Sequence, residues 1–224
     1  MSLIINKQTC VVFDLDDTLY KEVEFLKSAY RHISNLLLPF TRIDIYDFMF
    51  DLYAKGENTF DIVKEKFSFP YSIKEIVAEY RNHKPSINLP QQTRAVLEEI
   101  KSMAGKVGLL TDGRSLSQRN KIEALDLSLF FDDVRISEET GCQKPADDCF
   151  TFFERKYQEM EQFIYVGDNI KKDFVTPNKL GWQTLGLVMD ESNIHQQDLG
   201  IDQIYHPKTW IKNLEEMLDK LKKN

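Results

Sequence analysis

Four short segments of the chain are apolar along almost their whole length: residues 10–15, 107–111, 163–167 and 184–188. A strand that is apolar on both sides needs cover on both faces, as in parallel sheets. A weaker segment of this kind covers residues 134–137. The stretches between them carry apolar residues at helical spacing, such as Val96, Leu97, Ile100 and Met103. Strands that alternate with helices predict an α/β fold with a doubly wound parallel sheet.

Residues 21–84 interrupt this alternation, because they carry helical patterns and no convincing strand. The first helix is expected to end at Pro39, since proline cannot continue a helix. Three further helical runs follow within this segment. We therefore expect a small all-helical domain at 21–84, inserted into a core formed by residues 1–20 and 85–224. Residues 210–223 predict a terminal amphipathic helix.

The composition excludes several classes of protein. The chain has 224 residues and a formal net charge of -7, which argues against general nucleic-acid binding. No apolar run approaches the roughly 20 residues of a membrane helix, and the N-terminus lacks the pattern of a signal peptide. We therefore expect a cytoplasmic protein without a membrane partner, and the sequence sets no oligomeric state. Cys10, Cys142 and Cys149 predict neither a disulfide framework nor a zinc site.

The first apolar strand runs directly into acids, at Asp14, Asp16 and Asp17, followed by Thr18. Buried carboxylates are unfavourable unless a cation compensates them, and in open α/β sheets ligands bind beyond the carboxyl ends of strands. This pattern favours a metal site. The alternative is an acid-rich turn in which Thr18 caps a helix.

Polar residues also follow other strands. Thr111 ends the second strand, Lys144 lies in a connecting loop, and Asp168 follows a later strand, with Asp173 close behind it. Each has an ordinary alternative: a helix cap for Thr111, a solvated surface residue for Lys144, and a first-turn helix acid for Asp173. Together they would converge on one edge of one sheet. Nucleophile, metal, anion hole and positive charge are the groups that phosphoryl transfer needs.

These residues resemble the motifs of the haloacid dehalogenase superfamily. The D-x-D-x-T pattern runs from Asp14 to Thr18, and the strand-end Thr111, the Lys144-Pro145 pair and a G-D-x-x-x-x-D pattern ending at Asp173 follow in the family's order. The resemblance covers essentially the whole core. It implies a Rossmann-like core, with a helical cap between the first two motifs.

The resemblance also implies roles for the acids. Asp14 would be the nucleophile and a ligand of Mg²⁺, and Asp16 would be the general acid, then base, with its backbone carbonyl on the metal. Asp168 would be the third protein contact to Mg²⁺. Asp173 would hold metal-bound water or position Lys144.

The phosphoryl group would be bound by Thr111 and Lys144, with the backbone N–H groups of Asp112 and Leu15. Many relatives carry Asn where this chain has Asp112, so we expect the Asp112 side chain to point away or to pair with a base such as Arg114.

The implied function is a Mg²⁺-dependent phosphatase that acts on a small phosphorylated metabolite, such as a sugar phosphate or a nucleotide, through an aspartyl phosphate. Asp16 separates the chain from the dehalogenases, whose halide leaves without protonation. Two alternatives stay open: a sugar phosphomutase, and a non-catalytic binding module on the same fold.

Overall fold

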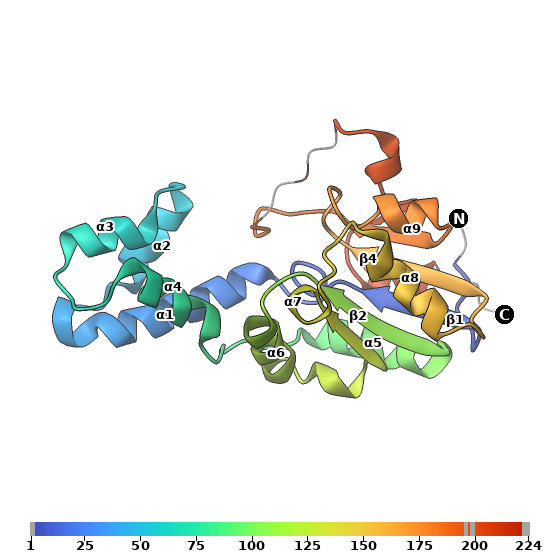
Figure 1. The fold of residues 1–224 in the computed structure, drawn as a ribbon, viewed down its shortest axis with the longest axis horizontal. Coiled ribbons are helices and arrows are strands. Elements are labelled where there is room, and N and C mark those ends of the chain that lie inside the picture. The colour runs from blue at the N-terminus through green and yellow to red at the C-terminus, as the bar shows by residue number, and fades with distance from the viewer. Residues whose placement is uncertain (1–2, 195–196, 198–199, 221–224) are drawn as a thin grey trace.

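A six-stranded parallel sheet forms the centre of the larger part of the molecule (Figure 1). The computed structural model describes residues 3–194, 197 and 200–220. The strand order is β3-β2-β1-β4-β5-β6, and each strand pairs in parallel with its neighbours. The strands are β1 (Thr9–Phe13), β2 (Lys106–Thr111), β3 (Asp133–Ile136), β4 (Gln162–Gly167), β5 (Gln183–Leu187) and β6 (Thr209–Ile211).

Side chains of the central strand β1 alternate between two hydrophobic cores. Val11 and Phe13 pack into one core, while Cys10 and Val12 pack into the other. All four are fully buried, which explains why the strand is apolar at every position. Helices α5 (Gln91–Met103), α6 (Ser115–Ala124) and α10 (Glu215–Asp219) contribute to the first core, and α8 (Asp147–Lys156) contributes to the second.

The remaining elements of the core are short. They are α7 (Ser137–Thr140), α9 (Val175–Lys179) and the 3-10 turns η1 (Leu127–Leu129) and η2 (Gln203–Tyr205). None of the helices in the described residues has the length and apolar character that a membrane crossing needs.

The segment between β1 and α5 forms a separate helical layer, at the left of Figure 1. Its helices are α1 (Glu22–Thr41), α2 (Tyr46–Ala54), α3 (Thr59–Lys66) and α4 (Ile73–Asn82). They bury an apolar core of their own around Ile33, Met49 and Ile76. Ser72 and Glu75 form a capping box that begins α4. The predicted fold class, a parallel α/β sheet with an all-helical insertion, is confirmed, while the domain limits at 20/21 and 84/85 stay a prediction.

Two local predictions were wrong. Pro39 does not end α1, which continues to Thr41 before Arg42 turns into the left-handed region. Pro39 has no N–H to donate to the carbonyl four residues earlier, but α1 continues for only two residues beyond it, so the loss is confined to the end of the helix. The predicted helix at 210–223 instead begins with β6, because Trp210 and Ile211 pair with β5. Only Glu215–Asp219 is helical there, and residues 221–224 lie outside the described residues.

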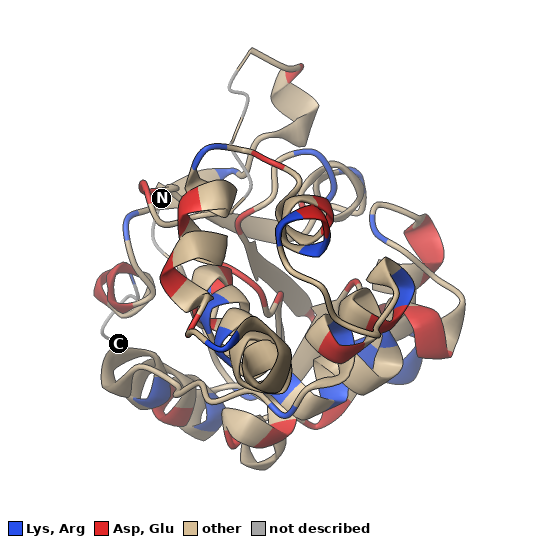
Figure 2. Cartoon of the chain, turned by 90° about the vertical axis from the view of Figure 1, so that its left-hand side faces the viewer, with Lys and Arg blue, Asp and Glu red and all other residues tan. Residues whose placement is uncertain are grey.

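Basic and acidic residues are interspersed on the face drawn in Figure 2, which looks at the molecule from the helical insertion. The described residues of that face therefore show no continuous basic stripe, which is what a nucleic-acid backbone would require.

Candidate active site

Two strand ends bring acidic side chains together at one edge of the sheet. Asp14 follows β1 and Asp168 follows β4, and the Asp14 N–H donates to the Val166 carbonyl at 2.9 Å. Carboxylate oxygens of Asp14, Asp168 and Asp173 lie within 4.8 Å of one another, and all three side chains are buried. Burial raises the pKa of Asp14 to about 6, although the Lys144 ammonium lowers it. Burial and the carboxylates of Asp173 and Asp14 raise the pKa of Asp168 to about 9.

Lys144 holds one side of this acidic group. Its ammonium lies 2.7 Å from Asp14 Oδ1 and 2.7 Å from Asp173 Oδ1, and it donates to the Tyr165 hydroxyl at 3.0 Å. Burial alone would lower the pKa of Lys144, but the Asp14 and Asp173 carboxylates raise it well above its usual range. The three donors of the ammonium are matched by three acceptors, so Lys144 fixes the orientation of Asp14.

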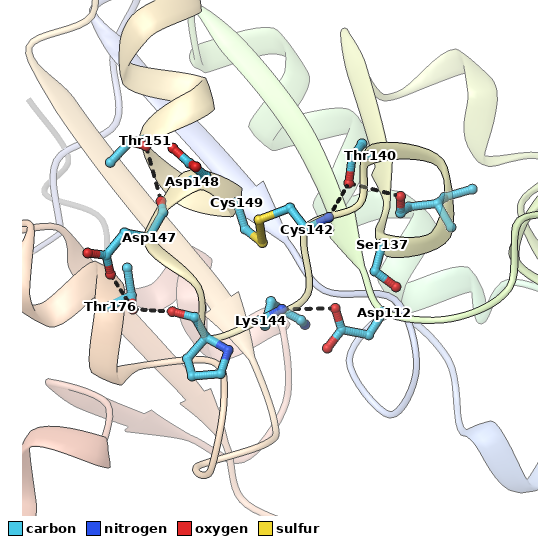
Figure 3. Close-up of a disulfide and its surroundings, with 12 residues drawn as sticks. Asp112, Ser137, Thr140, Cys142, Lys144, Asp147, Asp148, Cys149, Thr151 and Thr176 are labelled. Carbon is cyan, nitrogen blue, oxygen red and sulfur yellow. Dashed lines mark hydrogen bonds between the residues drawn. A yellow bond between two sulfur atoms is a disulfide. The ribbon is translucent and has the colours of Figure 1, made fainter.

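The loop that carries Lys144 is held on both sides (Figure 3). Cys142 and Cys149 form a disulfide whose Cα atoms are 5.6 Å apart, and it joins the loop to α8. The Lys144 N–H donates to Asp112 Oδ1 at 3.1 Å, across the sheet edge. The prediction that the cysteines form no disulfide was therefore wrong for this pair, whereas Cys10 is a buried free thiol.

Both carboxylate oxygens of Asp173 have partners. Oδ1 pairs with Lys144, and Oδ2 accepts hydrogen bonds from the N–H groups of Asp168 (3.2 Å) and Asn169 (2.9 Å). Gly167 permits this approach, because a Cβ there would lie 2.5 Å from Asp173 Oδ2. Asp173 therefore orders the loop and Lys144, which leaves Asp14 and Asp168 as the better carboxylate ligands for a cation.

A small chamber of about 110 Å³ opens in front of these acids, and we call it the phosphoryl chamber. Its lining residues are Asp14, Asp16, Asp17, Glu22, Asp112, Asp168, Asn169 and Lys172. The lining is rich in carboxylate oxygens, which are the hard ligands that suit Mg²⁺. A divalent cation between Asp14 and Asp168 would offset the unfavourable burial that raises the pKa of both groups, so the residues present fit this metal.

Lys172, which the sequence analysis did not single out, is the cation on the wall of the phosphoryl chamber. Its ammonium lies 3.3 Å from Asp112 Oδ2. Burial and the Lys144 charge lower the pKa of Lys172, but the Asp14, Asp173 and Asp112 carboxylates raise it by more. The net pKa is raised, so Lys172 is positively charged. Asp112 thus pairs with Lys172 and not with Arg114, the partner that we expected. Lys172 lies inside the motif that ends at Asp173, and this position was the signal available in the sequence.

Asp16 is surrounded by hydrogen-bond donors. Its carboxylate accepts from the Tyr20 hydroxyl (2.6 Å) and the Gln118 amide (3.0 Å), and the Lys121 ammonium contacts both of its oxygens at 2.7 and 2.9 Å. Burial would raise the pKa of Asp16, but Lys121 and the other donors lower it below its usual value. No sequence motif includes Tyr20, Gln118 or Lys121. The one available signal was the spacing of Gln118 and Lys121, whose polar side chains lie one helical turn apart on α6.

Thr111 is buried and does not line the phosphoryl chamber. Its hydroxyl oxygen accepts a hydrogen bond from the Gln118 amide at 2.6 Å, and this amide also bonds Asp16. Thr111 is not a helix cap, because the N-cap residue of α6 is Arg114. Thr18 is not one either, since its hydroxyl oxygen is buried and has no hydrogen-bond partner among the described residues.

A second chamber, of about 300 Å³, lies between the helical insertion and the sheet domain. Its lining residues are Asp16, Glu22, Phe25, Tyr80, Arg81, Asp112, Gly113, Arg114, Ser117, Gln118 and Lys121. It shares Asp16, Glu22 and Asp112 with the phosphoryl chamber, so the two adjoin. We call it the outer chamber.

The family model of the haloacid dehalogenase-like hydrolases matches residues 11–187. The chain belongs to this family. A relative of this hydrolase, the glyceraldehyde 3-phosphate phosphatase of Methanocaldococcus jannaschii, is 32% identical over 223 residues, covering 92% of this chain and 98% of that protein. A protein of the same name from Methanothermobacter thermautotrophicus is 27% identical over 204 residues, covering 84% and 88%.

Among solved structures, the magnesium-bound YfnB of Bacillus subtilis superposes with a TM-score of 0.67 at 20% identity, over 96% of this chain and 98% of that one. At this identity the likeness shows the fold. The family match and the relatives confirm that this hydrolase is a phosphatase, a phosphoric monoester hydrolase.

Proposed function

We propose that this hydrolase removes phosphate from a small phosphorylated sugar, with Mg²⁺ as its cofactor and Asp14 as the nucleophile. The observation that carries the proposal is the fixed orientation of Asp14. Lys144, which is itself paired with Asp173, contacts one carboxylate oxygen of Asp14, while Asp14 lines the phosphoryl chamber. The similarity to two glyceraldehyde 3-phosphate phosphatases supports a sugar phosphate as substrate.

In the first step an Asp14 carboxylate oxygen attacks phosphorus, and the bond from phosphorus to the sugar oxygen breaks. Asp16, in its protonated form, gives its proton to that oxygen, so the sugar leaves as an alcohol. In the second step Asp16 takes a proton from water as the water oxygen attacks the phosphorus of the aspartyl phosphate. Inorganic phosphate leaves, and Asp14 and Asp16 return to their starting forms.

The remaining residues supply charge and position. Lys172, on the chamber wall, would bind the non-bridging phosphate oxygens, and Lys144 would keep Asp14 aligned. Asp14, Asp168 and the backbone carbonyl of Asp16 would hold Mg²⁺, which would supply positive charge to the phosphoryl oxygens when bound. Thr111 would act through Gln118, and the backbone N–H of Asp112 would assist phosphate binding.

The test is phosphate release from a panel of sugar phosphates, with glyceraldehyde 3-phosphate included. It is run with Mg²⁺, with EDTA, and with the variant Asp14→Asn; Asp51→Asn, at an exposed position of α2, is the matched control. We expect release that requires both the metal and Asp14 and is unchanged in the control. Release that persists in Asp14→Asn would refute the assignment of the nucleophile. Conversion of one sugar phosphate into another without free phosphate would indicate a phosphomutase.

A further inference from the structure

The outer chamber is placed to receive the part of the substrate that leaves. It adjoins the phosphoryl chamber along Asp16, the residue that would protonate the leaving oxygen. A phosphate group beside Asp14 therefore directs its sugar into the outer chamber. Residues of α1 and α4 line one part of this chamber, and residues at the start of α6 line the other.

The outer chamber is larger than a three-carbon sugar requires. Its volume is about 300 Å³, whereas a cavity needs only about 10 to 15 Å³ on the same measure to hold one water molecule. The leaving portion of a triose phosphate has only six non-hydrogen atoms. The volume therefore leaves room for a leaving group that is longer than a triose.

Two arginines of the outer chamber have no hydrogen-bond or ion-pair partner in the part of the chain that the structure describes. Arg81 lies in the last turn of α4, and Arg114 is the N-cap residue of α6. Neither guanidinium forms an ion pair or a hydrogen bond with another of the described side chains or backbone groups. The other arginine of α6, Arg119, differs, because its guanidinium pairs with both carboxylate oxygens of Glu139.

The third cation of the outer chamber is already engaged. Lys121 lies within 2.9 Å of both Asp16 oxygens and 3.8 Å from Glu22. Asp112, the remaining acid of the lining, pairs with Lys172. The positive charge that is left for a ligand is therefore that of Arg81 and Arg114.

The segments that carry these two arginines are in contact. The Asn120 amide of α6 donates to the carbonyls of Asn82 and His83, both at 3.1 Å, and Asn82 directly follows Arg81. One ligand can thus face both arginines. The planar, forked donors of a guanidinium match the oxygens of a carboxylate or a phosphate.

We infer that the substrate is a phosphomonoester whose leaving group carries a second anionic group, a carboxylate or a further phosphate, bound in the outer chamber by Arg81 and Arg114. This inference rests on the proposed function, since it concerns the substrate of the same site. Arg81 and Arg114 are then specificity residues. Glyceraldehyde 3-phosphate, which the two relatives reported above are named for, lacks a second anion and is expected to be a poor substrate of this hydrolase.

The experiment compares substrates that differ in one charged group. Two pairs test the carboxylate: glyceraldehyde 3-phosphate with 3-phosphoglycerate, and glucose 6-phosphate with 6-phosphogluconate. A third pair, ribulose 5-phosphate with ribulose 1,5-bisphosphate, tests the second phosphate. We expect kcat/KM to be at least about tenfold higher for the member with the second anionic group, either in the carboxylate pairs or in the bisphosphate pair. The kind of pair that shows this preference identifies the anion.

Variants then link this preference to the two arginines. Arg81→Gln and Arg114→Gln are each expected to lower the ratio of charged to uncharged kcat/KM about fivefold, the range of a solvent-exposed ion pair, and the double variant about 25-fold. Lys84→Gln, which removes an exposed charge near Arg81 but outside the chamber, should leave the ratio unchanged. Using the ratio within one preparation cancels any loss of folded enzyme.

Three outcomes separate the two proposals. Equal or lower kcat/KM for the charged member of all three pairs would overturn the inference while leaving the phosphatase proposal intact. A preference that survives the double variant would also overturn it. No phosphate from any of these compounds, or from p-nitrophenyl phosphate, in folded protein with Mg²⁺ would instead contradict the proposed function.

Discussion

The metal-free protein is expected to become more stable when Asp168 is replaced by Asn. Asp168 is only 5% exposed, and burial and the neighbouring carboxylates of Asp173 and Asp14 raise its pKa to about 9. In the unfolded chain the same carboxyl ionises near pH 3.9. Without a cation, the folded protein must therefore keep this carboxyl protonated or bury its charge. The neutral Asn side chain avoids both costs.

The sign and the size of the effect follow from proton linkage. Between the unfolded pKa and the folded pKa, the folded state holds a proton that the unfolded state has released, so stability falls as pH rises. The fall is about 1.4 kcal/mol for each pH unit while the folded group remains protonated. At pH 7 this group would lower the free energy of unfolding by about 4 kcal/mol, and we expect Asp168→Asn to recover about 2 to 4 kcal/mol of it.

The assay is urea denaturation in EDTA at pH 5, 6 and 7, with the wild type, Asp168→Asn and the exposed control Asp51→Asn. The stability gap between Asp168→Asn and the wild type should widen as pH rises, whereas the control should follow the wild type. Added Mg²⁺ should stabilise the wild type and have little effect on Asp168→Asn. A variant that is less stable than the wild type at pH 7 in EDTA, or a gap that does not change with pH, would refute the reasoning.

Three further changes probe the loops that hold the site. Asp173→Asn leaves the buried Lys144 with one carboxylate partner; we expect a loss of about 3 kcal/mol in unfolding free energy by urea titration, and kcat at least about 100-fold lower. Gly167→Ala forces a Cβ to within 2.5 Å of Asp173 Oδ2, so both stability and kcat should fall, by about 1 to 3 kcal/mol for stability in the same titration. Cys142 and Cys149 are only seven residues apart in sequence, so reduction of their disulfide should lower the unfolding free energy by at most about 2.5 kcal/mol. Dithiothreitol should have no effect on the stability of a Cys142→Ser/Cys149→Ser variant.

The sequence predicted the sheet and the acids at its edge because both depend on local patterns. A strand that is buried on both faces must be apolar throughout, as β1 is. Acidic residues that directly follow such a strand therefore stand out in the sequence. The short strand β6 was missed because it has only three residues and two of them are partly exposed. Its residues also fit an amphipathic helix, so periodicity could not separate the two.

The contacts of the site depended on distances along the chain that no local pattern records. The Lys121 contact with Asp16 joins residues 105 apart, and the Lys144 contact with Asp14 joins residues 130 apart. The motifs placed Lys144 and Asp14 in one site but did not predict their contact, and no motif included Lys121. The disulfide was missed for a similar reason, since two of three irregularly spaced cysteines become a pair only when the loop folds back onto α8.

Asp16 links the core chemistry to the helical insertion. Lys121, which holds Asp16 in its ionised form, lies 4.4 Å above the ring of Phe25 and 3.8 Å from Glu22, and both of these residues belong to α1. In the proposed mechanism the ionised form of Asp16 would accept a proton from water in the second step, whereas the first step would need the protonated form. A change in the position of α1 relative to α6 would alter the surroundings of Lys121 and so the ease with which Asp16 gains a proton. Under the proposed function the insertion would therefore have two connected roles: it would form the wall against which the sugar binds, and it contacts the lysine that would control the charge of the general acid.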